Sequence, residues 1–187
     1  MTERVLVTGA TGFIGGRLAA RLASSARDVR CLVRDRGGTR ARELERAGFD
    51  LHEGDVLRPE TLRGAGEGMD VAYYLIHSMG RGGSKDFAVT DRAAATAFAR
   101  MARMEGIERI IYLGGLGETG PDLSKHLSSR REVEQALAST GVPVTVLRAA
   151  MIIGSGSASF LPPTRPPCCF ARQWPLRRTC RAGCARP

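Results

Sequence analysis

Long apolar runs are missing from this chain of 187 residues. No segment approaches the ~18 consecutive apolar residues that a membrane-spanning helix requires. The first four residues, MTER, also lack the charged and then apolar pattern of a signal peptide, and they lead almost directly into a short apolar run. We therefore expect a protein without a membrane span that resides in the cytoplasm.

Acidic residues are missing from residues 161–187, which hold six arginines, six prolines and four of the five cysteines. Without these arginines the chain has 22 basic and 19 acidic residues, so most of the formal net charge of +9 lies in this segment. The rest of the chain has no long basic stripe that could follow a phosphate backbone, which argues against nucleic-acid binding. Cys168 and Cys169 are adjacent, a spacing that suits a tetrahedral zinc ion poorly. We expect no metal site.

Lysine is almost absent as well, because residues 1–160 contain 20 arginines and two lysines. This usage is typical of GC-rich coding DNA, and reading such DNA out of frame yields mixtures of Pro, Arg, Ala, Cys and Gly like residues 161–187. Our leading hypothesis is that a frameshift replaced the natural continuation of the chain. The alternative is a real, disordered basic tail. The sequence thus predicts one domain over residues 1–160 and a separate segment after it.

Short apolar runs alternate with helical patterns between residue 4 and about residue 154. Such alternation predicts βαβ units and a parallel sheet that is buried on both faces. Right-handed crossovers then leave essentially one doubly wound topology. The predicted strands are residues 4–8, 29–33, 49–53, 71–76, 109–113 and 142–147, and the predicted helices are residues 13–25, 40–47, 58–63, 87–104 and 124–139.

A glycine-rich segment, TGATGFIG at residues 8–15, lies between the first predicted strand and the first helix. In this context Gly9 permits a sharp turn, Gly12 lets the backbone approach a pyrophosphate, and Gly15 lets the helix pack closely. The start of the helix offers free N–H groups to the anion. The pattern therefore predicts a dinucleotide-binding loop rather than a merely structural turn. The residues of this predicted loop are Gly9, Thr11, Gly12, Phe13, Ile14 and Gly15.

The same segment resembles the fingerprint of extended and atypical short-chain dehydrogenases/reductases, including their NmrA-like and epimerase-like branches. The resemblance covers residues 1–160, and it implies an NAD(P)-dependent oxidoreductase. It also implies a three-layer, doubly wound α/β Rossmann fold with a parallel sheet, incomplete at its C-terminus because relatives add another strand and a substrate-binding region. Besides the glycines, it rests on GDV at 54–56, YYLIHS at 73–78, RIIYLGG at 109–115, LRAA at 147–150 and GSGS at 154–157.

The choice between NAD and NADP depends on the end of the second predicted strand, where an acidic residue would bind the ribose 2′-hydroxyl of NAD. The sequence there is Val33-Arg34-Asp35-Arg36. We predict that Arg34 binds the 2′-phosphate of NADP, because a guanidinium matches phosphate oxygens bidentately. In the alternative, Arg34 is a solvated strand-end residue and Asp35 binds the ribose of NAD.

Four further residues owe their predicted roles to the resemblance. It implies that Asp55 accepts a hydrogen bond from the adenine amino group while the N–H of Val56 addresses the ring. It places Ile76 and His77, at the end of the fourth strand, near the nicotinamide ribose. In the alternative readings, Asp55 caps the following turn and His77 is a strand-end histidine that hydrogen-bonds neighbouring backbone.

The sequence departs from active relatives at the positions of their Ser, Tyr and Lys. His126 occupies the Tyr position, Arg130 the Lys position four residues later, and Gly114-Gly115 stands where the Ser is expected. Histidine can donate a proton near neutral pH, and Arg130 could bond the ribose hydroxyls, so we predict catalytic roles for both. The alternative is an exposed helix face that is rich in Glu, Arg and Ser.

Two functions remain open at this point. The first is an NADP-dependent reductase or dehydrogenase of a small carbonyl or alcohol. The second is an NAD(P)H-binding sensor or assembly factor of the NmrA-like kind, which the missing Ser, Tyr and Lys favour. A nucleotide-sugar epimerase is disfavoured because it also relies on the Tyr and Lys. The predicted partners are the nicotinamide dinucleotide and an unidentified small substrate, and the sequence predicts no particular oligomeric state.

Overall fold

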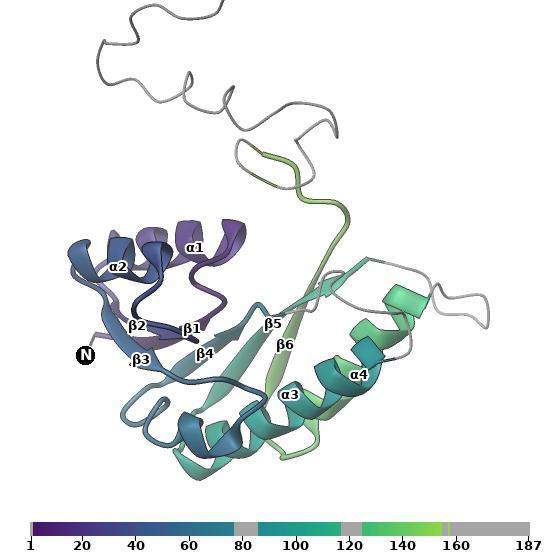
Figure 1. Cartoon of the computed structure of the whole chain (residues 1–187). Helices are drawn as coiled ribbons and strands as arrows, with labels where there is room; N and C mark the ends of the chain where they lie inside the picture. The colour runs from purple at the N-terminus through teal and green to yellow at the C-terminus, as the bar shows by residue number, and fades with distance from the viewer. Residues whose placement is uncertain (1, 77–85, 117–124, 155–156, 158–187) are drawn as a thin grey trace, which may run out of the picture. The chain divides into compact units, whose positions relative to one another are not determined.

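A computed structural model describes residues 2–76, 86–116, 125–154 and 157 (Figure 1). The described residues up to Met151 form one compact unit. The predictions for residues 161–187, including the frameshift and the tail cysteines, lie outside the described residues. The elements are β1 (Arg4–Thr8), α1 (Phe13–Ala23), β2 (Asp28–Val33), α2 (Thr39–Arg46), β3 (Asp50–Glu53), the 3₁₀ helix η1 (Pro59–Leu62), β4 (Val71–Tyr74), α3 (Asp86–Met104), β5 (Arg109–Gly115), α4 (Lys125–Ala138) and β6 (Val144–Ala149).

The six strands form one parallel sheet in the order β3-β2-β1-β4-β5-β6. The chain first builds outward from β1 to β3 and then returns to the other side of β1 to build β4 to β6 (Figure 1). The order therefore reverses between β1 and β4, which is where ligands of open α/β sheets bind. The predicted doubly wound Rossmann fold is confirmed.

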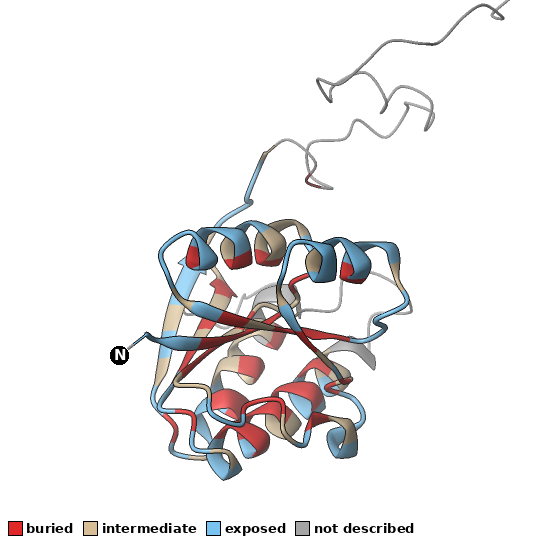
Figure 2. Ribbon diagram, turned by 90° about the vertical axis from the view of Figure 1, so that its left-hand side faces the viewer, coloured by how far each residue is buried: buried red, intermediate tan, exposed pale blue. Residues whose placement is uncertain are grey.

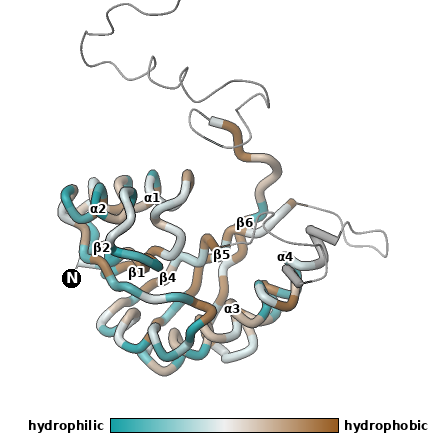
Figure 3. Tube along the Cα trace, in the orientation of Figure 1, coloured by the Kyte–Doolittle hydropathy of each residue, from teal (hydrophilic) through white to brown (hydrophobic). Residues whose placement is uncertain are grey.

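Alternate residues of each strand face opposite sides of the sheet, as the two-residue period of a strand requires. In β1, Leu6 packs with α3 and α4, whereas Val5 and Val7 pack with α1 and α2. Figure 2 shows the buried residues along the strands and on the inner sides of the helices. Figure 3 shows apolar residues along the strands and many hydrophilic residues on α1 and α2. Two hydrophobic layers thus cover the two faces of the sheet.

Two strand ends differ from the prediction. β4 ends at Tyr74 rather than at residue 76, because the next N–H, that of Leu75, donates to the side-chain hydroxyl of Thr8 (3.1 Å). β5 continues through Gly114 and Gly115, which the sequence marked as the end of the strand, because both glycines pair with β6. Pairing in the tertiary structure outweighs the weak strand propensity of glycine here.

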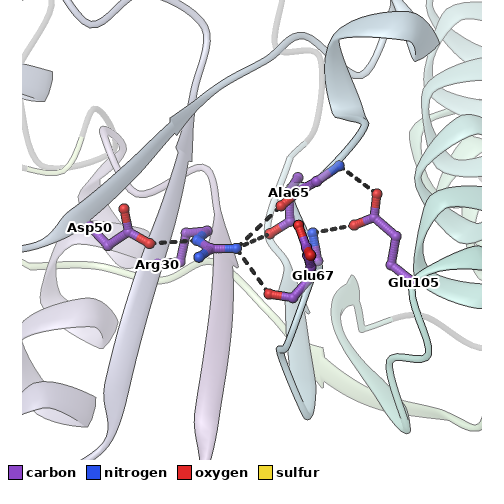
Figure 4. A network of polar contacts seen from close by, with 7 residues as sticks. Arg30, Asp50, Ala65, Glu67 and Glu105 are labelled. Carbon is purple, nitrogen blue, oxygen red and sulfur yellow. Dashed lines mark hydrogen bonds and ion pairs between the residues drawn. The ribbon is translucent and has the colours of Figure 1, made fainter.

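The loop between η1 and β4 is held from two sides (Figure 4). The carboxylate of Glu105 accepts hydrogen bonds from the N–H groups of Gly64 (2.6 Å) and Gly66 (2.5 Å). Arg30 forms an ion pair with Asp50 (2.5 Å). The same guanidinium donates to three loop carbonyls, those of Gly64 (3.2 Å), Ala65 (3.3 Å) and Glu67 (3.1 Å). Arg30 of β2 and Glu105, directly after α3, therefore fix this loop.

No helix in the described ranges is long and apolar enough to cross a membrane. Among the same residues no group of three or more His, Cys, Asp or Glu side chains lies close enough together to hold a metal ion. Cys31, in β2, is fully buried with a free thiol, and burial raises its pKa to about 12. Its thiol is therefore protonated in the folded chain at neutral pH.

Candidate functional site

The turn after β1 has the conformation that the glycine pattern predicts. Gly9 adopts a positive φ of 68°, which favours glycine, and its carbonyl accepts a hydrogen bond from the N–H of Gly12 (2.9 Å). A Cβ atom on Gly15 would lie 2.1 Å from the carbonyl oxygen of Gly9. Only glycine at position 15 therefore lets α1 approach the turn this closely.

The first turn of α1 leaves its N–H groups available. Gly12, the N-cap residue, has an extended conformation (φ −84°, ψ 174°), and no side chain caps the helix. The first turn also contains no acidic residue. Because the first N–H groups of a helix have no intrahelical acceptor, they are positioned to donate to an anion. The residues present thus fit the pyrophosphate of a dinucleotide.

Thr8 links the glycine turn to the neighbouring strand, a role that the sequence analysis did not assign. Its fully buried hydroxyl donates to the carbonyl of Tyr73 (3.0 Å) and accepts from the N–H of Leu75 (3.1 Å). A Cβ on Gly9 would lie 3.3 Å from the carbonyl of Leu75, so the turn touches the end of β4. Thr8 therefore sets the distance between β1 and β4 where the strand order reverses.

The charged residues after β2 differ in what they contact. Arg34 is exposed and has no ion-pair or hydrogen-bond partner in the part of the chain that the structure describes. The Asp35 carboxylate accepts from the N–H of Gly37 (2.7 Å), which closes a local turn. Arg36 pairs with Glu45 (2.9 Å). Arg34 is thus the available cation at this strand end, whereas one oxygen of Asp35 is already engaged.

Asp55 and Val56 follow β3. One carboxylate oxygen of Asp55 accepts from the N–H of Leu57 (3.0 Å), so the capping contact that we considered as an alternative is present. The N–H of Asp55 donates to the hydroxyl of Thr61 (2.8 Å). Val56 is buried, and its N–H has no acceptor among the described residues. The roles of both residues toward adenine stay predictions.

The end of β4 carries the next pair of predicted residues. Ile76 lies two residues beyond the strand, is half-buried and packs against the hydrophobic layer on the α3 and α4 side. His77 lies outside the described residues. The contact of Ile76 with the nicotinamide ribose stays a prediction.

Arg130 and His126 are both in α4, one helical turn apart. The guanidinium of Arg130 donates to the carbonyl of Leu113 in β5 (3.2 Å). The backbone of His126 lies nearer the start of the helix, and its side chain lies outside the described part. The predicted contact of Arg130 with ribose hydroxyls stays a prediction, as does proton donation by His126.

Two buried tyrosines, Tyr74 of β4 and Tyr112 of β5, lie on the face of the sheet that α3 and α4 cover. Burial raises the pKa of both Tyr74 and Tyr112, and the carboxylate of Asp91 raises it further. Arg130 lowers the pKa of Tyr112 and offsets part of this effect. The ring of Tyr74 packs on those of Phe98 (centroids 5.0 Å apart) and Tyr112 (6.2 Å). Both phenols are therefore protonated at neutral pH and are buried in the core.

The sheet brings the predicted cofactor residues to one edge. All strands are parallel, so their carboxyl ends meet there. A groove of about 860 Å³ lies elsewhere, over η1 and α3, with exposed Val89 and Met104 in its wall. None of the predicted cofactor residues lines this groove. The carboxyl edge, where Gly9, Arg34, Asp55 and Ile76 follow β1, β2, β3 and β4, is therefore the candidate functional site.

The chain is similar to known NAD(P)H-binding proteins. The family model described as NAD(P)H-binding matches residues 9–158. The chain is 30% identical to the ceramide reductase of Caulobacter vibrioides over 158 residues, which are 84% of this chain and 49% of that protein. It is 29% identical to the 2-alkyl-3-oxoalkanoate reductase of Shewanella oneidensis over 137 residues, 68% of this chain and 34% of that protein. The chain thus spans half or less of the length of these two reductases.

The fold is similar to that of the Citrobacter sp. triphenylmethane reductase complexed with NADP(H), with a TM-score of 0.63 and 25% identity over 79% of this chain and 50% of that chain. It also matches a putative NAD-dependent epimerase/dehydratase from Bacillus halodurans, with a TM-score of 0.67 and 22% identity over 79% of this chain and 70% of that chain. These matches confirm the predicted resemblance. The chain belongs to the NAD(P)H-binding family of Rossmann proteins, within the extended, NmrA-like short-chain dehydrogenases/reductases.

Proposed function

We propose that this chain is the cofactor domain of an NADP(H)-dependent reductase or dehydrogenase of a small carbonyl compound or alcohol. The observation that carries the cofactor choice is the arrangement after β2, where Arg34 is unpaired among the described residues and Asp35 accepts from Gly37. An unpaired guanidinium favours a 2′-phosphate. The names of the two curated reductases support reduction as the reaction.

Each strand end has its own part in binding. The N–H groups at the start of α1 hold the pyrophosphate, and Arg34 pairs with the 2′-phosphate. Asp55 accepts from the adenine amino group through the oxygen that is not used by Leu57, and the N–H of Val56 donates to the ring. Ile76 and His77 lie beside the nicotinamide ribose. The bound nicotinamide supplies or accepts the hydride.

His126 is the proton donor in this proposal. Histidine is the side chain type that can both give and take a proton near neutral pH. Arg130, four residues later, is on the same face of α4. During reduction His126 donates its proton to the carbonyl oxygen as that oxygen gains negative charge, and during alcohol oxidation it takes the proton back.

The test is NADPH consumption by this chain with a panel of aldehydes and ketones, followed by absorbance. We expect His126→Ala to lower kcat by about 100-fold or more and to leave the NADPH affinity within about twofold. Arg131→Ala, at a neighbouring position of α4, is the matched control and should change neither. Retained turnover in His126→Ala would remove this residue from the mechanism.

A second function, an NAD(P)H-binding sensor without turnover, is favoured by one observation. Gly114 and Gly115, which pair with β6, have no side chain, so these two positions offer no hydroxyl to align a carbonyl. Tight NADPH binding without consumption across the whole carbonyl panel would select the sensor over the reductase.

A further inference from the structure

β5 is longer than its neighbour β4 at the carboxyl edge. Pairing between the two strands ends at Tyr74 and Tyr112, whereas pairing of β5 with β6 continues to Gly115. Leu113, Gly114 and Gly115 therefore have a strand partner on one side only. The open side lies beyond the end of β4, next to the point where the strand order reverses.

Arg130 occupies this open side. Its Nη1 donates to the carbonyl of Leu113 (3.2 Å), the first residue of β5 beyond the β4 pairing. In return, the buried hydroxyl of Tyr112 donates to the backbone carbonyl of Arg130 (3.4 Å). β5 and α4 are thus joined by two hydrogen bonds, one that Arg130 donates to Leu113 and one that Tyr112 donates to Arg130.

α4 also contacts β6 one turn further on. Glu134 forms an ion pair with Arg148 of β6, 3.0 Å from Nη2 of Arg148 to each carboxylate oxygen. Arg130 itself has no carboxylate partner among the described residues. It is half-buried, it donates to the backbone carbonyl of Leu113, and it lowers the pKa of the neighbouring Tyr112 phenol. The charge of Arg130 thus faces a backbone carbonyl of β5 and the phenol of Tyr112, both at the strand end where the pairing with β4 has stopped.

We propose that Arg130 is a positioning residue that caps the open end of β5 and thereby holds Gly114, Gly115 and the first turns of α4 in place for the nicotinamide half of the cofactor. This inference rests on the proposed function. This role replaces the ribose contact that the sequence predicts for Arg130, because Arg130 acts through the Leu113 carbonyl and not by contact with the cofactor. The planar guanidinium is suited to this role because it holds its donors in a fixed fork.

The experiment compares Arg130→Met, which keeps the length of the side chain but removes the donor, with Arg130→Lys, which keeps a cationic donor. Arg131→Met is the matched control on the same helix. Two measurements are made on each variant: hydrogen exchange of the amides of residues 113–115 without ligand, and the affinities for NADPH and for adenosine 2′,5′-bisphosphate. The second ligand lacks the nicotinamide half.

We expect Arg130→Met to exchange faster at residues 113–115 and to bind NADPH about tenfold more weakly, as expected for loss of one charge-assisted hydrogen bond. Its affinity for adenosine 2′,5′-bisphosphate should stay within about twofold, because Arg34 and the glycine turn are untouched. Arg130→Lys should restore most of the NADPH affinity, and Arg131→Met should match the wild type.

Three results would overturn the positioning role. Equal weakening of both ligands would make Arg130 a general structural residue, and weaker NADPH binding with unchanged exchange would make it a direct cofactor contact. If Arg130→Lys does not restore the NADPH affinity, the hydrogen-bond donor at this position has no role. The lysine variant also tests the proposal if the methionine variant does not fold. A wild-type chain that binds neither ligand would instead contradict the proposed function.

Discussion

At the scale of single residues, the proposed preference for NADP(H) rests on two neighbours of opposite charge. The Asp35 carboxylate is engaged by the Gly37 N–H, whereas Arg34 is exposed. We expect NADPH to bind more tightly than NADH, by a factor that shrinks with salt because the contact is solvent-accessible. Arg34→Asp should reverse this order. Fluorescence titration with both cofactors measures it.

The control for that experiment is Arg103→Asp, which makes the same change of net charge near the end of α3, at the opposite edge of the sheet. It should leave the preference for NADPH intact. If the two cofactors bind equally well before and after the change at Arg34, the assignment of Arg34 to the 2′-phosphate is wrong.

Gly15 provides a second prediction at this scale. A methyl group there would lie 2.1 Å from the carbonyl oxygen of Gly9 and 2.6 Å from its carbonyl carbon, so Gly15→Ala must displace either the turn or α1. We expect the NADPH affinity to fall by at least about tenfold, because the displaced N–H groups lose their alignment with the pyrophosphate. Gly16→Ala is the control, since its Cβ would be 3.1 Å from the Ala10 carbonyl. Similar affinities for both variants would contradict the close-approach argument.

The glycine spacing was sufficient to predict the turn, because it directly reflects a positive φ and a close backbone approach. The role of Thr8 could not be predicted in the same way. A threonine in a β-branched strand is explained by propensity alone, and its two hydrogen bonds depend on which strand lies beside β1. The engagement of Asp35 did have a sequence signal, since an aspartate two residues before a glycine is typical of an Asx turn.

At the scale of elements, apolar runs and helical periods predicted every strand and helix in order, but not every boundary. The sequence Gly114-Gly115 indicated the end of β5, yet both residues pair with β6. Such pairing depends on contacts between distant segments, which local propensity does not contain. The same limit applies to Arg130, whose contact with Leu113 follows from β4 ending before β5.

The first residues of the sheet give a pH-dependent prediction. The Asp70 carboxylate, directly before β4, accepts from the backbone N–H of Arg4 (2.8 Å) and from its guanidinium (3.2 Å). These contacts, the backbone hydrogen bond first, hold the pKa of Asp70 below its usual range. Stability from this group is therefore present above the unfolded-state pKa of ~3.9 and is lost as the pH falls through the lower folded-state pKa.

Accordingly, Asp70→Asn should lower the midpoint of urea unfolding at pH 7 and reduce the loss of stability between about pH 5 and pH 2. Asp28→Asn, at the exposed start of β2, is the control because no hydrogen bond or ion pair of its carboxylate is found among the described residues. An Asp70→Asn variant with the same acid dependence as the wild type would show that the Arg4 contacts do not couple protonation to folding.

At the scale of the whole molecule, the carboxyl edge of the sheet connects the two hydrophobic layers. The glycine turn leads into α1, which covers one face of the sheet, while Thr8 fastens the turn to β4, whose Tyr74 packs on the other face. A ligand held by this edge should stabilise the unit up to Met151 as a whole.

At 100 times its dissociation constant, NADPH should add about 2.7 kcal/mol to the free energy of unfolding. For a unit of this size that corresponds to a rise in Tm of roughly 5–10 °C in a single transition. NADH at the same concentration should raise Tm less, and Arg34→Asp should exchange the two effects. If NADPH raises the Tm of only part of the thermal unfolding transition, the two hydrophobic layers of the sheet unfold separately. Equal shifts of Tm with both cofactors would contradict the NADP(H) assignment.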